Sequence, residues 1–247
     1  MITRITCALL LLPVVAAFSL ADGLVFKVPD DKTAAVYGLE FNLESNGKKL
    51  VQKGTVTIAS VGQAEVSDVK LRWLEIAIKI SEGEEKYRMI FKVLIAEKFL
   101  QEGGSPSECI LKCWWARKIR PDEDGKNLKA ELLEKHPHDE RWSYLPTLIL
   151  TGSLNDKKRL EGVEMGTPFG KAVCYGVSGK FDYEQETRHW QTKVETRLHP
   201  KSPFGVVSSR VEFTMRREPR NLVFTGVALF TLTEVLQNYE GELPTYK

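Results

Sequence analysis

The sequence predicts an α+β fold dominated by β-structure: a curved antiparallel sheet or half-barrel, with a helical insertion at about residues 105–138. Long stretches alternate apolar and polar residues with a period of two, which is typical of half-buried strands. Turn residues separate these stretches at the spacing of hairpins. One central segment changes to helical spacing and begins with a capping sequence. These three observations together favour a mostly antiparallel sheet interrupted once by helix.

The first hairpin is expected between YGLEFNL (37–43) and LVQKGTVTIASV (50–61). Asn46-Gly47 lies between them, and this pair suits a two-residue type I′ turn because both positions need a positive φ. Such a turn places Leu43 opposite Leu50.

A second, longer hairpin is expected between VKLRWLEIAIKI (69–80) and YRMIFKVLIAEKFL (87–100). In the first of these strands the apolar alternation changes phase after Trp73. A phase change inside a strand indicates a bulge or a switch of the buried face.

The helical insertion is predicted from SPSECILKCWWARKI (105–119), where Ser105 is the cap, Pro106 takes the first helical position and Glu108 completes a capping box. An apolar stripe follows at helical spacing, formed by Ile110, Leu111, Trp114 and Trp115. LKAELLEKH (128–136) is a second, short helical candidate. We expect the first helix to cover the open mouth of the curled sheet. One tryptophan of the pair Trp114 and Trp115 then lines the entrance, where it can contact a ligand; the alternative is that both are ordinary core residues.

The C-terminal half returns to strands, at roughly 10-residue spacing. The expected strands are PTLILTGSL (146–154), KAVCYGVSG (171–179), KFDYEQETR (180–188), HWQTKVETRL (189–198), VVSSRVEFTMR (206–216) and LVFTGVALFTLTEVL (222–236). Pro-Phe-Gly occurs twice, at 168–170 and 203–205, each time before an apolar strand. Because Pro cannot donate to a ladder and Gly allows a sharp corner, we expect a corner at each site, with Phe169 and Phe204 tucked under the sheet as weak candidates for ligand contact.

The first 21 residues have the layout of a secretory signal peptide. One positive charge precedes an apolar run, and small residues at Ser19 and Ala21 mark the cleavage site. We expect an exported protein, periplasmic or extracellular, with one β-rich domain over 22–247 and no membrane-spanning segment after signal removal. The net charge of the whole chain is only +2, which argues against a nucleic-acid binder.

Three cysteines follow the expected cleavage site: Cys109, Cys113 and Cys174. An odd number in an exported protein leaves one thiol unpaired. One interpretation is a disulfide between Cys174 and either of the other two; the alternative is that all three are reduced and buried as small hydrophobic residues.

Two segments resemble a known group of proteins. LEGVEMGTPFGKAVCYGVSGKF (160–181) and KVETRLHPKSPFGVVSSRVEF (193–213) are similar to exported bacterial proteins of unknown function with a LolA-like antiparallel half-barrel. The resemblance covers about residues 160–215. It implies a half-barrel that curls around a helical plug, and it supplies no catalytic residues; lipoprotein carriage does not follow from fold likeness alone.

Candidate chemical sites are few. His136, His138 and Asp139 have the side chains of a zinc or copper site, although Pro137 between the histidines favours a solvated turn. Cys174 with His189 or His199 has the composition of a nucleophile and base, but its apolar surroundings favour a structural thiol. The sequence has no Walker A, Gly-x-Ser-x-Gly, Cys-x-x-Cys or His-Glu-x-x-His motif, and it predicts no cofactor.

Three functions remain open. The first is a non-enzymatic exported binding or carrier module whose concave apolar face takes an apolar ligand or a protein partner. The second is a secreted or periplasmic hydrolase that uses Cys174 or a metal at His136 and His138. The third is a structural or assembly protein that pairs through exposed strand edges.

Overall fold

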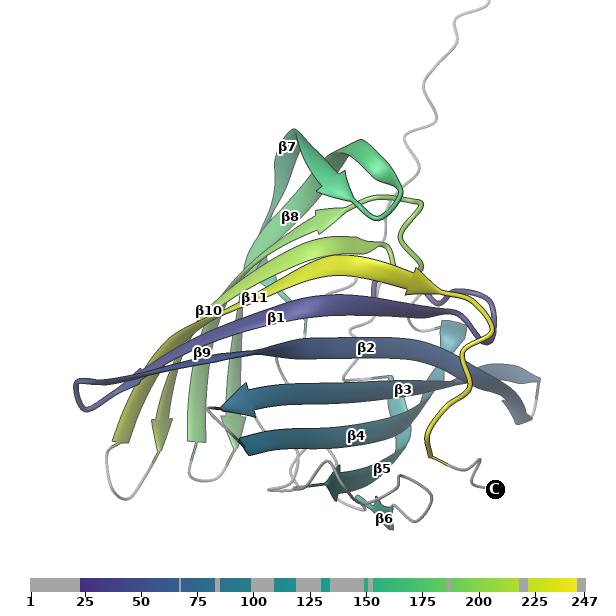
Figure 1. Ribbon diagram of the computed structural model, residues 1–247, viewed down its shortest axis with the longest axis horizontal. Helices are drawn as coiled ribbons and strands as arrows, with labels where there is room; N and C mark the ends of the chain where they lie inside the picture. Colours follow the sequence, from purple (N-terminus) through teal and green to yellow (C-terminus); the bar gives the residue numbers. More distant parts are fainter. Residues whose placement is uncertain are drawn as a thin grey trace, which may run out of the picture.

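The described residues form one large antiparallel sheet. The computed structural model describes residues 23–66, 68–82, 85–98, 109–118, 130–133, 149–150, 153–185, 188–217 and 222–243. Within them, Figure 1 shows the strands of a strongly curved sheet. The strands are β1 (Ala34–Ser45), β2 (Lys48–Val66), β3 (Val69–Glu82), β4 (Glu85–Ala96), β5 (Ile110–Lys118), β6 (Glu131–Leu132), β7 (Asn155–Thr167), β8 (Gly170–Gln185), β9 (Arg188–Leu198), β10 (Val206–Arg217) and β11 (Leu222–Leu236).

The strand order is β6-β5-β4-β3-β2-β1-β11-β10-β9-β8-β7. Strands β1 to β6 make one arm of the sheet, strands β7 to β11 make the other, and the two arms join where β1 pairs with β11. The terminal strands β6 and β7 are not hydrogen-bonded to each other, so the described sheet is curved but not closed. This confirms the predicted β-dominated, curved antiparallel fold.

The first predicted hairpin is confirmed in its turn and its register. Asn46 and Gly47 have φ values of 50° and 74°, as a type I′ turn requires. Leu43 lies opposite Leu50. The hairpin of β3 and β4 is also confirmed, and the phase change in β3 marks a strand that is buried on both faces over residues 71–78.

The predicted helix is wrong over the residues that the structure describes. Ile110–Lys118 is strand β5, paired with the outer edge of β4. Trp114 and Trp115 therefore point to opposite faces of the sheet, and neither belongs to a helical lid. The alternation is readable with a period of two, because Cys113 and Trp115 pack on one side while Trp114 and Ala116 pack on the other. The nine-residue strand β5 pairs with the edge of the long strand β4, which provides partners for backbone hydrogen bonds. The spacing of apolar residues within the segment does not show that this edge is available.

The second helical candidate is wrong where it can be seen. Glu131–Leu132 forms strand β6, which pairs with Trp114 and Trp115 of β5. The predicted cap over residues 105–108 lies outside the described residues. Among the described residues, no helix is long and apolar enough to cross a membrane.

The C-terminal arm differs from the prediction in three places. Residues 171–179 and 180–188 were expected as two strands, whereas Gly170–Gln185 is the single strand β8. Ile149 and Leu150, part of a predicted strand, are not in a strand. The charged segment Asn155–Thr167 is strand β7, which the sequence pattern did not predict because most of its side chains are exposed.

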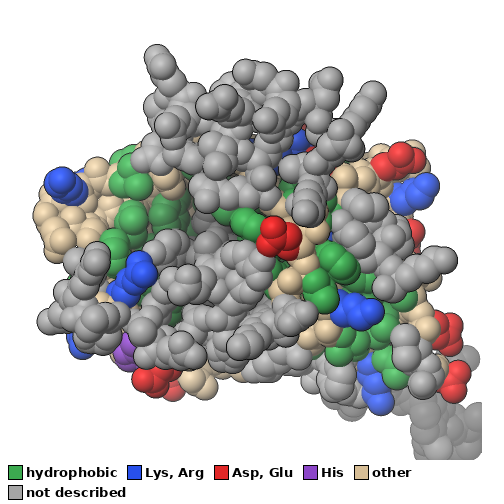
Figure 2. All heavy atoms as spheres, turned by 90° about the horizontal axis from the view of Figure 1, so that it is seen from below, with side chains coloured by type: hydrophobic (Ala, Val, Ile, Leu, Met, Phe, Trp, Pro, Cys, Tyr) green, Lys and Arg blue, Asp and Glu red, His purple; other side chains and the backbone are tan. Residues whose placement is uncertain are grey.

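One face of the sheet, here called the inner face, carries the main hydrophobic cluster. Both arms contribute buried side chains to it, among them Tyr37, Phe41, Ile58, Leu74, Ile76, Phe91, Val93, Cys113, Trp190, Val211, Phe213 and Phe230. The opposite, outer face carries two smaller clusters, both on the arm of β1 to β6. Seen from below the view of Figure 1, hydrophobic side chains reach the surface in two groups, with charged side chains around them (Figure 2).

Both Pro-Phe-Gly segments form corners that lead into strands, as predicted. Gly170 begins β8, and Gly205 directly precedes β10. Their φ values are 98° and 83°, a conformation that favours glycine. The two corners lie at the same end of the sheet, where the ring of Phe169 stacks on His199 with centroids 5.0 Å apart and the carbonyl of Phe204 accepts a hydrogen bond from the backbone N–H of Phe26.

Candidate functional site

The inner face is the candidate site for an apolar ligand. Its centre is an aromatic group contributed by both arms: Phe41 of β1 stacks on Phe213 of β10 with centroids 5.6 Å apart, and Trp190 of β9 is tilted against Phe213 at 5.8 Å. Rows of aliphatic residues extend from this group across both arms. An apolar face of this extent, on a curved sheet whose described strands do not close on themselves, is the kind of surface that the sequence predicted as a binding face.

Irregular segments cover part of this face. Leu24 and Val25 are fully buried in the main cluster, and the backbone N–H of Leu24 donates to the carbonyl of Ile149 at 2.8 Å. Leu150 and Leu154 pack in the same cluster. The cover described here is therefore made of short non-strand segments, not of a second sheet.

The inner face continues beyond this cover on β8. Tyr175 lies opposite Leu198 of β9, which packs against the main cluster, so both are on the inner face. Yet Tyr175 is 65% exposed and Val173, two residues earlier, is 50% exposed. A Cβ added to Gly162 of β7 would lie 2.8 Å from Val173 Cγ1 and 3.0 Å from Tyr175 Cε1, so the glycine leaves room for both side chains. These two residues form an apolar rim that joins solvent to the inner face.

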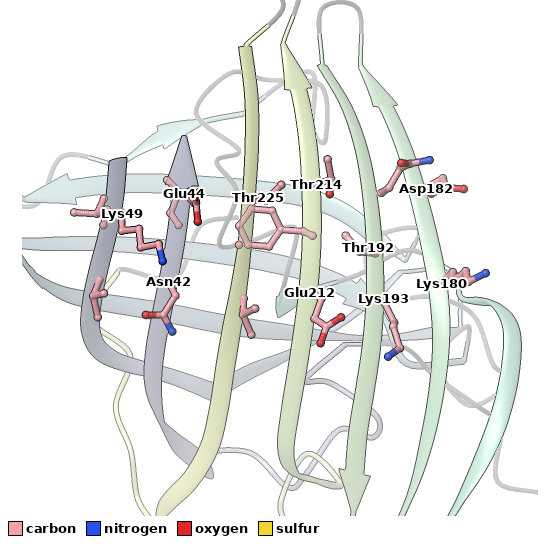
Figure 3. A pocket seen from close by; sticks show the side chains of 17 residues that line it. Asn42, Glu44, Lys49, Lys180, Asp182, Thr192, Lys193, Glu212, Thr214 and Thr225 are labelled. Carbon is pink, nitrogen blue, oxygen red and sulfur yellow. The ribbon is translucent and has the colours of Figure 1, made fainter. Parts of the chain in front are cut away.

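A polar groove of about 940 Å³ lies on the outer face, at the ends of β1, β2 and β8 to β11 (Figure 3). Cross-strand register explains its shape. Two rows of side chains form its walls: Lys49, Glu44, Thr225, Thr214, Gln191 and Asp182 in one, and Val51, Asn42, Val227, Glu212, Lys193 and Lys180 in the other. The row between them, which includes Leu43, Gly226 and Phe213, directs its side chains to the inner face and leaves its backbone as the floor.

The charges of this groove neutralise one another. Three lysines and three carboxylates line it, and Glu212 accepts hydrogen bonds from Arg210 at 2.9 and 3.0 Å. Among its described lining residues, the one aromatic side chain is that of Phe213, whose ring is buried on the inner side. Exposed pairs of this kind contribute little energy, and the groove has the character of a solvated strand surface.

The four predicted ligand contacts occupy three different places. Trp115 packs against the main cluster on the inner face, while Trp114 packs against Leu71, Trp73, Leu94 and Ala96 on the outer face. Phe204 is fully buried beneath its corner. Phe169 is half-buried and lines a pocket of about 610 Å³ together with Pro168, Lys201, Thr233, Glu234 and Val235. The structure thus brings Phe169 and Phe204 to one end of the sheet and leaves the tryptophans elsewhere.

The three cysteines are buried thiols in this structure. Cys113 is on the inner face of β5, whereas Cys174 is on β8, near the opposite end of the strand order. Burial raises the pKa of the Cys174 thiol, partly offset by the charge of Arg197, and its Sγ donates to the carbonyl of Ala172 at 3.7 Å. A thiol with a raised pKa is a poor nucleophile at neutral pH.

The predicted metal site cannot be placed. His136, His138 and Asp139 lie outside the described residues. Within the described ranges, no group of three or more His, Cys, Asp or Glu side chains is arranged to hold a metal ion.

One polar cluster was missed by sequence analysis. Glu75 of β3 and Lys92 of β4 are direct cross-strand neighbours on the outer face, and each is only 1% exposed. The signal was present: each residue interrupts an apolar strand at a position that the hairpin register places opposite the other. An opposite-charge pair at matching positions of two otherwise apolar strands indicates a buried polar contact.

Comparison with known proteins shows low similarity to solved structures. No family model matches the chain, and no curated protein matches it. A solved DUF1329 family protein from Desulfovibrio piger is similar over 84% of this chain and 86% of its own, with 9% sequence identity and a TM-score of 0.28. That protein has a β-rich fold; the LolA-like resemblance is not confirmed.

Proposed function

We propose that this protein is a non-enzymatic, exported binding or carrier module that holds an apolar ligand, or an apolar segment of a protein partner, against its inner face. The observation that supports this proposal is the apolar inner face itself, which runs over both arms of a sheet whose described strands do not close on themselves. Because the described strands do not close on themselves, a ligand can reach this face from the side of the sheet.

The exposed rim supports the same function. Val173 and Tyr175 are solvent-exposed yet lie on the same face as the buried cluster. An apolar ligand that reaches this rim remains in contact with apolar side chains as it moves inward. Burying apolar surface in this way contributes about 25 cal/mol per Å².

The burial of the inner face sets a requirement for binding. Its central side chains, including Phe41, Phe213 and Trp190, are at most 5% exposed. A ligand must therefore displace covering segments such as Leu24–Val25, where the backbone N–H of Leu24 donates to the carbonyl of Ile149. We expect binding to be accompanied by a measurable change at these segments.

A hydrolase that uses Cys174 is less well supported by the geometry. The thiol is fully buried, its pKa is raised by desolvation, and Gly176 and Arg197 lie beside it on the outer face, away from the apolar rim. A catalytic thiol requires exposure and a lowered pKa.

The proposal also includes export of the protein and the absence of nucleic-acid binding.

Binding is tested with the fluorescent apolar probe N-phenyl-1-naphthylamine, added to the purified chain. We expect a saturable rise in probe fluorescence that a long-chain fatty acid reverses. Native mass spectrometry of the same sample then shows whether a lipid copurifies. A linear, non-saturable response at all probe concentrations, with no bound mass, would contradict the proposal.

The adjacent tryptophans give a matched pair for locating the ligand. Trp115 contacts the inner cluster and Trp114 the outer one. A brominated fatty acid should quench tryptophan fluorescence less in Trp115→Phe than in the wild type, and should quench Trp114→Phe at least as strongly as the wild type. The opposite order would place the ligand on the outer face.

A further inference from the structure

The segment after β11, Gln237–Leu243, crosses the outer face of the sheet. It is called the C-terminal segment below. Figure 1 shows it leaving the end of β11 and running across β2 toward β3 and β4. Asn238 turns the chain with a φ of 59°, and the backbone N–H of Tyr239 donates to the carbonyl of Lys32 at 2.8 Å. The path is thus fixed before the segment reaches β3.

Glu75 and Lys92 bind the main chain of this segment. The two carboxylate oxygens of Glu75 accept hydrogen bonds from the backbone N–H groups of Glu242, at 2.8 Å, and Leu243, at 2.9 Å. The Nζ of Lys92 donates to the carbonyl of Leu243 at 2.8 Å. A cross-strand pair therefore recognises three backbone groups on two successive residues. Charge-assisted hydrogen bonds of this kind are stronger than neutral ones.

Side-chain contacts add sequence preference. Leu243 is 3% exposed and packs on Ala77, Ile90 and Ala116, which form one cross-strand row beside Glu75 and Lys92. The preceding Glu242 makes an ion pair with Arg88 of β4. The contacts fit an acidic residue followed by leucine.

Gly241 adds a third preference. A Cβ at this position would lie 3.0 Å from Glu75 Oε2 and 3.2 Å from Val61 Cγ1. These distances are tighter than ordinary van der Waals contacts, so a larger residue would move the backbone away from the carboxylate. The site therefore favours the order Gly-acidic-Leu, which occurs here at 241–243.

The buried charges indicate that the contact is a built site. Placing a carboxylate and an ammonium group at 1% exposure is costly unless both are hydrogen-bonded. Apolar residues would cover these strands at lower cost. Glu75 and Lys92 recover the cost by binding the backbone of the segment, which apolar residues cannot do.

We propose that the outer face of β3 to β5, with Glu75, Lys92, Arg88 and the row Ala77–Ile90–Ala116, is a peptide-docking site whose occupant is the C-terminal segment of this chain. The site is filled by the chain's own segment and accepts the same segment from a second copy when the first is displaced. It lies on the opposite face from the proposed apolar ligand, so the two proposals succeed or fail independently.

The test uses full-length protein and a fluorescein-labelled synthetic peptide spanning residues 237–247. Leu243→Asp places a charge in the apolar row and should release the chain's own segment. We expect the peptide to bind this variant saturably, as measured by fluorescence anisotropy. Its affinity for the wild type should be lower by about tenfold or more, because the site of the wild type is already occupied. Adding Glu75→Gln to the variant, or using a peptide with Leu243→Asp, should weaken binding by about tenfold or more.

Two results would overturn the proposal: a Leu243→Asp protein with an unchanged circular dichroism spectrum that binds no peptide, or equal binding to the wild type. If the Leu243→Asp variant does not fold, amide hydrogen exchange in the wild type and in Glu75→Gln tests the same docking contact. In the wild type, the N–H groups of Glu242 and Leu243 should exchange slowly, and Glu75→Gln should accelerate both. Unchanged exchange in a folded Glu75→Gln protein would contradict docking through Glu75.

Discussion

Phe41 of β1 and Phe213 of β10 stack with an interplanar angle of 12°, although β11 runs between their strands. The contact is possible because Gly226 of β11, directly opposite Phe213, has no side chain. A Cβ at Gly226 would lie 2.5 Å from Phe213 Cζ and 2.6 Å from the carbonyl oxygen of Asn42. A glycine thus lets an aromatic pair join the two arms across the strand that separates them.

Gly226→Ala is expected to destabilise the protein by about 1–3 kcal/mol, because the new methyl group overpacks the inner face and must push Phe213 off Phe41. Gly38→Ala is the control, since a Cβ there would lie 3.5 Å from Thr233 Cγ2 and 3.8 Å from the carbonyl oxygen of Thr231, both ordinary contacts. Urea unfolding measures both variants. Equal stability of Gly226→Ala and the wild type would show that the stack does not depend on this glycine.

Glu75 makes stability depend on pH in a defined direction. Burial raises its pKa above the ordinary 4.5, against the opposing effects of the Leu243 N–H, Lys92 and Arg88. The folded state therefore binds this proton more tightly than the unfolded state. The cost of burying the ionised carboxylate lowers the free energy of unfolding. This cost is fully present above the raised pKa and is relieved as the pH falls toward 4.5.

Glu75→Gln removes this titration while keeping the shape of the side chain. We expect the free energy of unfolding of the wild type, minus that of Glu75→Gln, to increase as the pH falls through the raised pKa. Urea titrations at a series of pH values measure this difference. A difference that decreases with falling pH would mean that the folded state stabilises the carboxylate, in contradiction to its burial.

The two Pro-Phe-Gly corners should differ in their tolerance of a side chain. At Gly170, with a φ of 98° and nothing within 4 Å of a new Cβ, alanine should cost about 1–2 kcal/mol through backbone strain alone. At Gly205 a Cβ would also lie 3.0 Å from Phe26 Cβ, so Gly205→Ala should cost more than Gly170→Ala.

Gly166→Ala is the control for both corners, because its φ is not positive and a Cβ meets nothing within 4 Å. Its effect should stay within about 0.5 kcal/mol. Thermal or urea unfolding of the three variants gives the order. A Gly170→Ala protein as stable as the Gly166→Ala protein would show that the corner adopts another conformation.

Local patterns were sufficient where one face of a strand is buried and a turn has special chemistry. Asn46-Gly47 determined the first hairpin down to the pairing of Leu43 with Leu50. The Pro-Phe-Gly corners were predicted because proline and glycine restrict the backbone in known ways. In both cases the decisive information lies within a few residues.

Tertiary contacts decided the elements that were predicted wrongly. Ile110, Leu111, Trp114 and Trp115 fit helical spacing, yet the free edge of β4 makes this segment a strand with its tryptophans on opposite faces. Strand β7 has mostly exposed, charged side chains, and only its pairing with β8 makes it a strand. Neither neighbour can be read from the segment itself.

The sequence predicted what kind of surface the candidate site would be, but not which residues would form it. An apolar face on a curved sheet follows from the alternation of many strands. Which side Trp114 and Trp115 would take, and that Val173 and Tyr175 would be left exposed, depend on the register and on Gly162, which the sequence pattern does not reveal.

The pairing of β1 with β11 joins residues as far apart as Ala34 and Leu236, whereas every other ladder of the described sheet joins strands that are consecutive in the chain. The arm of β1 to β6 can therefore form one hairpin after another while the chain is being synthesised. The junction between the arms has to wait for the last strand, β11, whose pairing with β1 runs from Phe224 opposite Ser45 to Leu236 opposite Ala34. Until then β1 is an uncovered edge, and the time between making the first strand and the last is the period when the nascent chain is most open to mispairing with its neighbours.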